Sequence, residues 1–380
     1  MRNSLHIVAA HLTNDARVKS YVKMLRRLGW QTDVICYKES KLPLFEEGEG
    51  LRVYRVTSKY QGSSVLQYIK TYMHFYLAAK KLATHLHKKR SYNFVHVHNM
   101  PNFIIGIARS LSPKVPIILD MHDLMSVNFM TKFKSNCFAG QVIAYEEKWS
   151  ISKATKLVCA DRGQKQVLTR LHYNKDPIVI MNLADEDLFR WSDHSWIGGP
   201  FRFVYHGTIA WRLGVDRVIE ALRNLPEHIV FRLIGDGDEK ESIVNMIHAY
   251  SLNNRVEVLP IVPVEELPGL LSDCHAGVIP SRRTEATNSA MLPVKLLEYT
   301  SLGIPSVVSK LDNISLHFRE DQAAFFQPES QTDLKRAMSE ITISKTMRSR
   351  ILRGIQDFNI ANRWQHGAET YMRVVNEITS

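Results

Sequence analysis

The sequence predicts an α/β fold with two domains, each built on a parallel β-sheet that helices cover on both faces. Three observations support this prediction. Short β-branched runs alternate with longer amphipathic stretches, the 380 residues suffice for two hydrophobic cores, and one polar segment separates two similar halves. The expected architecture is two Rossmann-like domains whose sheets face a central cleft, with ligands bound at the carboxyl ends of the strands.

The first half of the chain alternates strand and helix patterns through most of its length. Its first predicted helix, for example, carries Val18, Val22 and Leu25 at helical spacing. By the same criteria the predicted strands are 6–10, 32–37, 51–56, 94–98, 116–120, 157–160 and 178–181, and the predicted helices are 16–28, 60–88, 103–110, 136–155 and 162–171.

A non-periodic stretch rich in polar residues, Gly and Pro lies at 191–200 and is interpreted as an interdomain linker. A second strand–helix series follows it. The sequence therefore predicts an N-terminal domain at 1–190 and a C-terminal domain at 201–360. In the second series the predicted strands are 201–205, 230–234, 256–259, 276–279 and 306–309, and the predicted helices are 215–225, 240–250, 264–273 and 293–302.

The composition is that of an ordinary globular protein, with 45% hydrophobic and 23% charged residues. No apolar run approaches the roughly 20 residues that cross a bilayer. The four cysteines are isolated from one another and match neither a zinc site nor a dense disulfide framework. This cysteine usage favours a reducing cytoplasm.

The net charge of +11 indicates an anionic partner. Basic and aromatic residues share one helix-like stretch, which suits a helix lying on an anionic membrane surface. The alternative is a solvated helix end whose cations interact favourably with the helix dipole. Nucleic acid is not expected as a partner, because no known binding motif is present. The stretch contains Lys80, Lys81, His85, His87, Lys88, Lys89 and Arg90, together with Tyr68, Tyr72, Phe75 and Tyr76.

The most informative motif spans residues 292–308. Lys295 and Glu298 stand three residues apart on a predicted helix, so their side chains emerge on one side. Gly303 and Pro305 end that helix before a β-branched strand. A cation beside a carboxylate suits a ligand with an anionic part and a hydroxylated part, such as a sugar nucleotide. The alternative is a surface ion pair on an amphipathic helix.

Two glycine turns follow strands of the second half. Gly207 permits close backbone approach, and Arg212, just before a helix, can meet a phosphate in bidentate geometry. Gly235 belongs to a second turn at the end of the next strand. The segment 236–238 superficially matches the Asp-x-Asp signature that holds a metal ion. Its flanking glycines favour a turn, and no third ligand is evident, so no metal site is expected there.

In their order and spacing these motifs resemble the retaining glycosyltransferases of the GT-B fold. The subgroup is family four, typified by bacterial surface-polysaccharide and lipid-linked sugar transferases. The resemblance covers almost the whole chain. The matching segments are 14–18, 95–101, 119–124 and 180–189 in the first half, and 206–214, 234–237, 280–281 and 293–305 in the second.

The resemblance implies how the second domain binds a nucleoside-diphosphate sugar with UDP or GDP as its nucleotide. Arg212 and Lys295 would neutralise the diphosphate, so that no metal ion or other cofactor is needed. Glu298 would bind the ribose hydroxyls, and Val262 would lie near the base. The complete set that the resemblance implies is Gly207, Arg212, Gly235, Val262, Lys295 and Glu298.

The resemblance also implies roles for the first domain. His122 would contact the transferred sugar as the catalytic residue. Residues 361–380 would form a C-terminal helix that returns to this domain. The acceptor side would be lined by Asn14, Arg17, His98 and Asn99.

One departure from the family pattern concerns the first carboxylate of its Glu-x7-Glu motif. That carboxylate should stand eight residues before Glu298, where this chain has Ala290. Glu285 lies further upstream and is a possible substitute carboxylate, and Asn288 or Ser289 could supply the contact instead. The departure affects recognition of the donor sugar more than the class of reaction.

Several of these residues have structural alternatives. The chain contains 16 histidines, so most of them serve no catalytic role. One of His96 and His98 is expected to face the sheet interior and to be structural. Arg17 could instead cap its helix or pair with Asp15.

The sequence therefore predicts a retaining glycosyltransferase that moves a sugar from UDP or GDP to a hydroxyl of a growing glycan or lipid-linked saccharide. The enzyme is expected to be cytoplasmic, at the inner face of the cytoplasmic membrane. Two alternatives remain open on the same fold: a catalytically weak scaffold subunit, which Ala290 favours, and a nucleotide-sugar epimerase, which needs no acceptor. The oligomeric state is not predicted.

Overall fold

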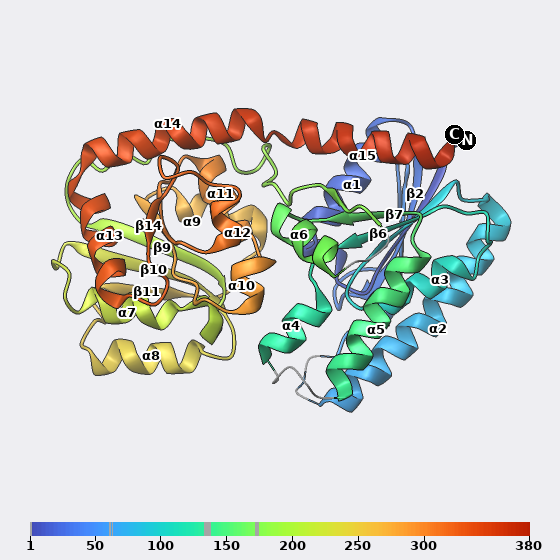
Figure 1. Ribbon diagram of the computed structural model, residues 1–380, viewed down its shortest axis with the longest axis horizontal. Helices are drawn as coiled ribbons and strands as arrows, with labels where there is room; N and C mark the ends of the chain where they lie inside the picture. Colours follow the sequence, from blue (N-terminus) through green and yellow to red (C-terminus); the bar gives the residue numbers. More distant parts are fainter. Residues whose placement is uncertain (1, 61, 63, 133–137, 172–174) are drawn as a thin grey trace. The chain divides into compact units, whose positions relative to one another are not determined.

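The structure, a computed structural model, describes residues 2–60, 62, 64–132, 138–171 and 175–380. These residues form two compact units, whose elements are labelled in Figure 1. Unit 1 consists of the residues up to Asn182 together with Gln365–Ser380, and unit 2 consists of Leu183–Trp364.

Unit 1 is built on an eight-stranded sheet in the order β3-β4-β2-β1-β5-β6-β7-β8. Its neighbouring strands pair in parallel, except that β3 pairs antiparallel with β4. The strand order changes direction at β1, which lies between β2 and β5. The strands are β1 (Asn3–Val8), β2 (Gln31–Lys38), β3 (Phe45–Gly48), β4 (Leu51–Ser58), β5 (Phe94–His98), β6 (Ile117–Met121), β7 (Lys156–Cys159) and β8 (Ile178–Val179).

The helices of unit 1 connect these strands and cover the sheet. The central strands β1 and β5 are almost entirely buried, as is typical of parallel strands between helical layers. The helices are η1 (Leu12–Asn14), α1 (Ala16–Arg27), α2 (Val65–Arg90), η2 (Asn102–Ile104), α3 (Ile105–Arg109), α4 (Met125–Lys132), α5 (Phe138–Lys153), α6 (Arg162–Arg170) and α15 (Trp364–Thr379).

Unit 2 is built on a six-stranded parallel sheet in the order β11-β10-β9-β12-β13-β14. Its strand order changes direction at β9. Apolar residues of the sheet and of α7, α8 and α13 form one buried core. The strands are β9 (Phe201–Thr208), β10 (Ile229–Asp236), β11 (Val256–Leu259), β12 (Ala276–Ile279), β13 (Ser306–Ser309) and β14 (Ala324–Phe326).

The helices of unit 2 follow the strands in turn, and α11 carries the motif singled out in the sequence. Helix α11 ends at Gly303, whose backbone adopts the left-handed conformation with φ of 82°. The helices are η3 (Trp211–Leu213), α7 (Val215–Leu222), α8 (Lys240–Ala249), η4 (Val264–Glu266), α9 (Leu267–Leu271), α10 (Glu285–Ser289), α11 (Val294–Leu302), α12 (Asp312–Ser315), α13 (Gln331–Ile343) and α14 (Lys345–Ala361).

The boundaries of the units differ from the predicted ones, because the segment predicted to be a linker at 191–200 packs on unit 2. Trp191 lies so close to Gly303 that a Cβ there would come within 2.8 Å of the indole. The His194 ring donates a hydrogen bond to the Cys274 carbonyl over 2.9 Å. The first boundary therefore falls at 182/183, and the second falls at 364/365 instead of near 360.

Most predicted strands and helices are present, with ends shifted by a few residues. The elements that the sequence did not indicate are β3, β14, α4, α10, α12, α13 and α14. Strand β3 is short, exposed and rich in charge, so it lacks the apolar alternation that marks a strand. The predicted helix 60–88 begins later, after the N-cap residue Ser64.

The packing of α15 on unit 1 gives a testable prediction. Tyr371 is fully buried, so Tyr371→Ala should lower the free energy of unfolding by about 3–5 kcal/mol. Tyr371→Phe keeps the ring and removes only the 2.8 Å hydrogen bond between the hydroxyl and His96 Nδ1. Tyr371→Phe should therefore lower the free energy of unfolding by only about 1 kcal/mol. Urea unfolding followed by circular dichroism measures both, and equal losses would contradict this packing.

Candidate functional site

Each unit has a point at which its strand order changes direction. In unit 1 this point lies between β1 and β5, and in unit 2 it lies between β9 and β12. Ligands of open parallel sheets bind at such points, just outside the carboxyl ends of the strands. Each unit therefore offers one candidate site.

In unit 2, two glycines bring the ends of β9 and β10 close together. Gly207 and Gly235 are directly paired across the sheet. A Cβ on Gly235 would lie 2.0 Å from the Gly207 carbonyl oxygen, so any other residue there would displace the backbone. Gly207 has a φ of 101°, which favours glycine. The result is a backbone edge that a ligand can approach closely.

Helix α11 places Lys295 and Glu298 at this edge. The Lys295 ammonium lies 3.8 Å from the centroid of the Tyr205 ring, in a cation–π contact. Glu298 Oε2 lies 3.1 Å from His206 Nε2. Because Tyr205 and His206 belong to β9, both side chains of the motif lie beside Gly207.

Helix α11 is held in this position by its buried face. Tyr299 is fully buried, and its hydroxyl donates a hydrogen bond to the Val204 carbonyl of β9 over 3.3 Å. Its ring also meets the His206 ring edge to face. Glu298, next in the chain to this anchor, is only 8% exposed. The carboxylate is thus part of a rigid surface.

Burial shifts the charge states of this site toward neutrality. It raises the pKa of Glu298 to about 7, against the opposing effect of Lys295. It lowers the pKa of Lys295 to about 7, an effect that Glu298 opposes and Arg212 reinforces. Burial and the nearby ammonium lower the pKa of His206 to about 3, so His206 is neutral at pH 7. An anion next to Lys295 would favour its charged form.

Arg212 lies in η3, the short helix that follows β9, and its charge acts on Lys295 and on Tyr205. Within the described part of the chain, neither Arg212 nor Lys295 has a carboxylate within the 4 Å of an ion pair. Among the described residues the two cations therefore make no ion pair at contact distance, although Glu298 lies close enough to act on the pKa of Lys295. This arrangement is typical of a site for an anionic ligand.

Arg282, which the sequence did not point out, holds the turn that carries Arg212. Its guanidinium donates to the Trp211 carbonyl over 2.7 Å and pairs with Asp216 over 2.8 and 2.5 Å. Its backbone N–H donates to the Arg212 carbonyl over 2.9 Å. The position of Arg282, three residues after the end of β12, was the only signal available in the sequence.

The remaining predicted residues of unit 2 lie around this edge on separate loops. Val262 is half-buried in the loop after β11. Glu285 is exposed at the start of α10, whereas Ala290 at its end is 5% exposed. The Asn288 amide already donates to Asp312 Oδ2 over 2.8 Å. The roles of Val262 and Glu285 therefore stay predictions.

The candidate site of unit 1 is a buried polar cluster centred on Asp120 of β6. Arg17 donates to both carboxylate oxygens of Asp120 over 2.8 Å and to the Ile180 carbonyl over 2.7 Å. Arg17 therefore neither caps its helix nor pairs with Asp15, and both of those alternatives are wrong. The cap of α1 is Asp15, which accepts a hydrogen bond from the Val18 N–H over 3.0 Å.

Imidazole groups surround the Asp120 carboxylate. His122 Nε2 lies 3.2 Å and His98 Nδ1 lies 3.4 Å from Asp120 Oδ2. These two nitrogens are 3.2 Å apart, and His6 Nδ1 lies 3.0 Å from His98 Nε2. The side chain of His98 is fully buried, whereas that of His122 is 21% exposed. Within this cluster, His122 is the imidazole that a ligand can reach.

His96 and His98 lie on the same side of β5, with ring centroids 4.1 Å apart. The expectation that only one of them faces the interior was wrong, because residues two apart on a strand point to one face. Both are fully buried. His96 contacts Tyr371 of α15, so it ties the C-terminal helix to the cluster.

Asn99 shapes the loop that carries His122. Its Oδ1 accepts a hydrogen bond from the His122 N–H over 2.6 Å, and its Nδ2 donates to the Asp123 carbonyl over 2.6 Å and to Asn102 Oδ1 over 2.9 Å. Asn99 is thus a buried organiser of the loop. The side chain of Asn14 lies outside the described residues. The acceptor-side roles given to this group stay predictions.

A metal ion is not assigned to this cluster. Ligand atoms of His98, Asp120 and His122 do lie within 4.8 Å of one another. However, both Asp120 oxygens already accept hydrogen bonds from Arg17, so an added cation would face a fixed positive charge.

Both halves of the chain match families of glycosyl transferases. Residues 15–183 match the family described as "Glycosyl transferase 4-like domain", and residues 192–356 match "Glycosyl transferases group 1". A putative colanic acid biosynthesis glycosyltransferase, WcaL of Escherichia coli K12, is 26% identical over 134 residues, which cover 34% of this chain and 33% of that protein. The match thus spans about a third of the length of this relative.

Two solved structures share the fold over nearly the whole chain. Sucrose-phosphate synthase from Thermosynechococcus elongatus has a TM-score of 0.82 and 16% identity, and the match covers 100% of this chain and 99% of that one. Anabaena HepE in complex with UDP-glucose has a TM-score of 0.75 and 14% identity, with 99% and 100% covered. At these identities the likeness establishes the fold.

The buried carboxyl of Glu298 predicts a pH-dependent effect of Glu298→Gln on the ligand-free protein. The pKa of Glu298 in the folded protein is raised to about 7. The protonated carboxyl of the wild type therefore adds to the free energy of unfolding below pH 4.5, and this contribution is lost as the pH rises to about 7. The variant lacks this ionisation. Its free energy of unfolding relative to wild type should therefore increase, by on the order of 2 kcal/mol between pH 5 and pH 8.

Chemical denaturation at several pH values measures this difference. Glu285→Gln makes the same chemical change at an exposed position and serves as the control. A Glu298→Gln difference that stays constant across this range would contradict the buried, ionisable carboxyl.

Proposed function

We propose that this chain, which belongs to the family-four-like glycosyltransferases of the GT-B fold, transfers a sugar from a nucleoside-diphosphate sugar to an acceptor hydroxyl in surface-polysaccharide synthesis. One observation carries the proposal: the charges of Arg212 and Lys295 act on each other beside the Gly207 edge, and neither makes an ion pair within 4 Å with a described carboxylate. A diphosphate supplies the missing negative charge. The UDP-glucose bound to HepE supports this class of donor.

The two cations have complementary geometry for a diphosphate. Arg212 offers a planar fork that can bind two phosphate oxygens, and Lys295 offers a compact charge. Binding of the anion raises the pKa of Lys295 from its low value in the free protein, so the lysine is charged when the donor is present. Glu298, on the next turn of α11, accepts hydrogen bonds from the ribose hydroxyls.

The same cations stabilise the leaving group. As the glycosidic bond to the nucleotide breaks, negative charge grows on the diphosphate, and Arg212 and Lys295 are already in place to meet it. Transfer therefore needs no divalent metal ion. The acceptor hydroxyl passes its proton to a phosphate oxygen, and the sugar keeps its anomeric configuration. His122 of unit 1 contacts the transferred sugar.

A non-catalytic scaffold subunit is the second candidate, because Ala290 replaces the first carboxylate of the family motif and is buried. This candidate binds a nucleotide but transfers no sugar. Transfer from a labelled donor to a membrane extract distinguishes it from the enzyme. An epimerase would instead convert its donor in the absence of an acceptor.

The acceptor is proposed to be lipid-linked, and unit 1 to bind the membrane that carries it. Among the described residues, no helix is long and apolar enough to span a bilayer. Two exposed apolar stripes lie on helices that both contact α3. The α2 stripe is 43–61% exposed and the α5 stripe 37–81%. The α2 stripe is Leu66, Ile69, Met73 and Leu77, and the α5 stripe is Phe138, Val142, Tyr145 and Trp149.

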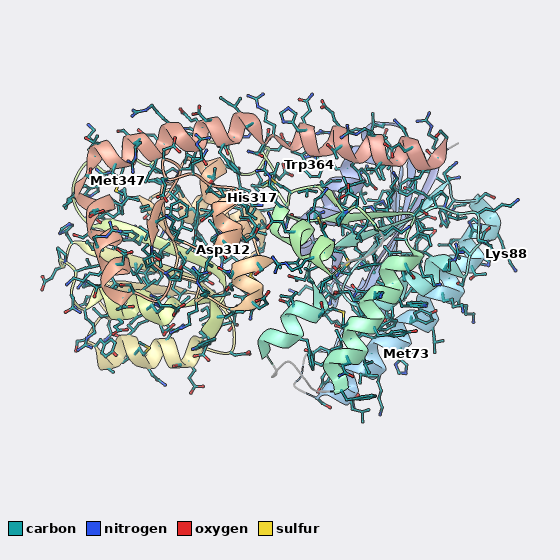
Figure 2. The ribbon with its side chains drawn as sticks, viewed as in Figure 1. Met73, Lys88, Asp312, His317, Met347 and Trp364 are labelled. Atoms are coloured by element: carbon teal, nitrogen blue, oxygen red, sulfur yellow. The ribbon has the colours of Figure 1, made fainter. Side chains whose placement is uncertain are left out.

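Exposed lysines Lys70, Lys80 and Lys81 flank the α2 stripe. Apolar residues with flanking cations suit insertion into a layer of anionic lipid headgroups. Figure 2 labels Met73 within the stripe and Lys88 near the C-terminal end of the same helix. The basic and aromatic set identified in the sequence is only partly exposed, since Phe75 belongs to the core.

Removal of either cation should slow transfer strongly. Arg212→Ala and Lys295→Ala should each lower the rate of transfer by about 100-fold or more, because each removes charge stabilisation from the leaving diphosphate. Lys335→Ala removes one exposed cation from α13 and is the matched control. Transfer is measured in excess EDTA, where wild-type activity is expected to persist.

Three results would contradict the proposal. Full activity of Arg212→Ala or Lys295→Ala would exclude the diphosphate contact. Loss of wild-type activity in EDTA, with recovery on added Mg²⁺, would exclude metal-free transfer. Nucleotide binding without transfer would favour the scaffold.

Removal of the α2 stripe should weaken membrane binding. Ile69→Ser combined with Leu77→Ser should lower affinity for phosphatidylglycerol vesicles by about tenfold or more. The reason is that the variant buries two fewer apolar side chains when it binds the lipid. Ile343→Ser removes an apolar residue that is 73% exposed on unit 2 and is the control. Vesicle sedimentation at low salt measures binding. Equal binding of wild type to phosphatidylcholine, or no binding at all, would contradict the anionic surface.

A further inference from the structure

His122 lies between two carboxylates, one on each side of its ring. Its Nε2 is 3.2 Å from Asp120 Oδ2 in the interior, and its Nδ1 is 3.9 Å from Asp15 Oδ2 nearer the surface. An ionised carboxylate accepts hydrogen bonds and donates none. Both ring nitrogens therefore face acceptors, which is the environment that suits an imidazole carrying two protons.

The backbone of His122 is held as well. The His122 N–H donates to Asn99 Oδ1 over 2.6 Å, and the His122 carbonyl accepts a hydrogen bond from Gln164 Nε2 over 3.0 Å. These contacts fix the backbone of His122 between the end of β5 and α6. The orientation of the ring comes from the 3.2 Å contacts of Nε2 with Asp120 Oδ2 and with His98 Nδ1.

The charge balance of the cluster also fits a protonated His122. The Arg17–Asp120 pair is neutral as a whole, and among the described residues His122 is the group whose protonation places a cation within 4 Å of Asp15. The charged and titratable groups that face His122 are Asp120 on β6, His98 on β5, and Asp15 and Arg17 at the start of α1. Protonation of His122 balances Asp15.

Burial lowers the pKa of His122, but the carboxylates of Asp120 and Asp15 outweigh burial and leave it above its ordinary value. The deeper imidazoles behave differently. Burial and the neighbouring imidazoles lower the pKa of His6 and of His96 well below their ordinary value. The cluster therefore has one imidazole suited to carry a proton, and that imidazole is at its exposed edge.

We infer that His122 acts as an imidazolium that donates a hydrogen bond from Nδ1–H to an oxygen of the sugar or acceptor, and that Asp120, Asp15 and His98 are positioning residues that fix this state. The inference rests on the proposed function and deepens it. It excludes His122 as the base that takes the acceptor proton, because a doubly protonated ring has no lone pair to accept one.

The two roles predict opposite pH dependences. A donating imidazolium is lost as pH rises through the pKa of His122, so transfer should fall on the alkaline side. A base is lost as pH falls, so transfer would fall on the acid side. Lys295 also titrates near pH 7 in the free protein. Variants must therefore show that the alkaline limb of the pH profile, where transfer falls, belongs to His122.

Asp15→Asn is the diagnostic variant. Asparagine is also a good N-cap, so α1 keeps the hydrogen bond that Asp15 Oδ1 accepts from the Val18 N–H. The variant removes only the outer negative charge. It should lower the pKa of His122 and move the alkaline fall in transfer to lower pH.

Titration of the protein with ¹³C-labelled histidine, followed by nuclear magnetic resonance, reads the charge of His122 directly. The signal is assigned as the one of 16 histidine signals that disappears in His122→Gln. The wild-type pKa should lie above 6.5, and Asp15→Asn should lower it. His122→Gln, which keeps a neutral donor, should retain part of the activity and lose the limb that Asp15→Asn moves.

The outcomes separate this inference from the proposed function. The titration is independent of transfer, so an inactive wild type would defeat the proposed function alone. A His122 pKa at or below 6.5, or one that Asp15→Asn does not change, would overturn the imidazolium. So would an acid limb of transfer that shifts in Asp15→Asn. His98→Gln should shift the pH profile of transfer and leave the melting temperature close to that of the wild type. An unchanged pH profile with a lowered melting temperature would reduce His98 to a structural residue.

Discussion

The close approach of two backbone strands at Gly207 and Gly235 is the constraint on which the candidate site of unit 2 depends. A side chain at Gly235 would push β9 and β10 apart, and β9 carries Tyr205 and His206, the residues that Lys295 and Glu298 contact. The absence of a Cβ at Gly235 therefore keeps these two strands together beside α11. It also leaves backbone open to a ligand at the point where the strand order changes direction.

The two units handle charge in opposite ways, and this difference assigns them different tasks. In unit 1, Asp120 is neutralised by Arg17 and surrounded by imidazoles, so a buried charge is fully compensated and the cluster gains rigidity. In unit 2, Arg212 and Lys295 make no ion pair within 4 Å among the described residues, and only the more distant Glu298 opposes the charge of Lys295. Such cations destabilise the free protein slightly and are stabilised by a ligand, which is how a binding site differs from a structural ion pair.

The sequence was informative where a function depends on neighbours along the chain. Lys295 and Glu298 could be found because helical spacing puts them on one side, and Gly207 because it ends a strand. Residues whose partners are distant in sequence were not found. Arg282 reaches back to the turn of Arg212, and Asp120 meets Arg17 across about a hundred residues. The apolar stripes of α2 and α5 show the helical period of a core face, and only the structure shows that they are exposed.

The most direct test of the central claim is a crystal structure of this protein with UDP. The account predicts that the diphosphate lies within hydrogen-bond distance of Arg212 and Lys295, and that the ribose hydroxyls lie within hydrogen-bond distance of the Glu298 carboxylate. A nucleotide bound elsewhere, or bound with its phosphates away from both cations, would contradict the account.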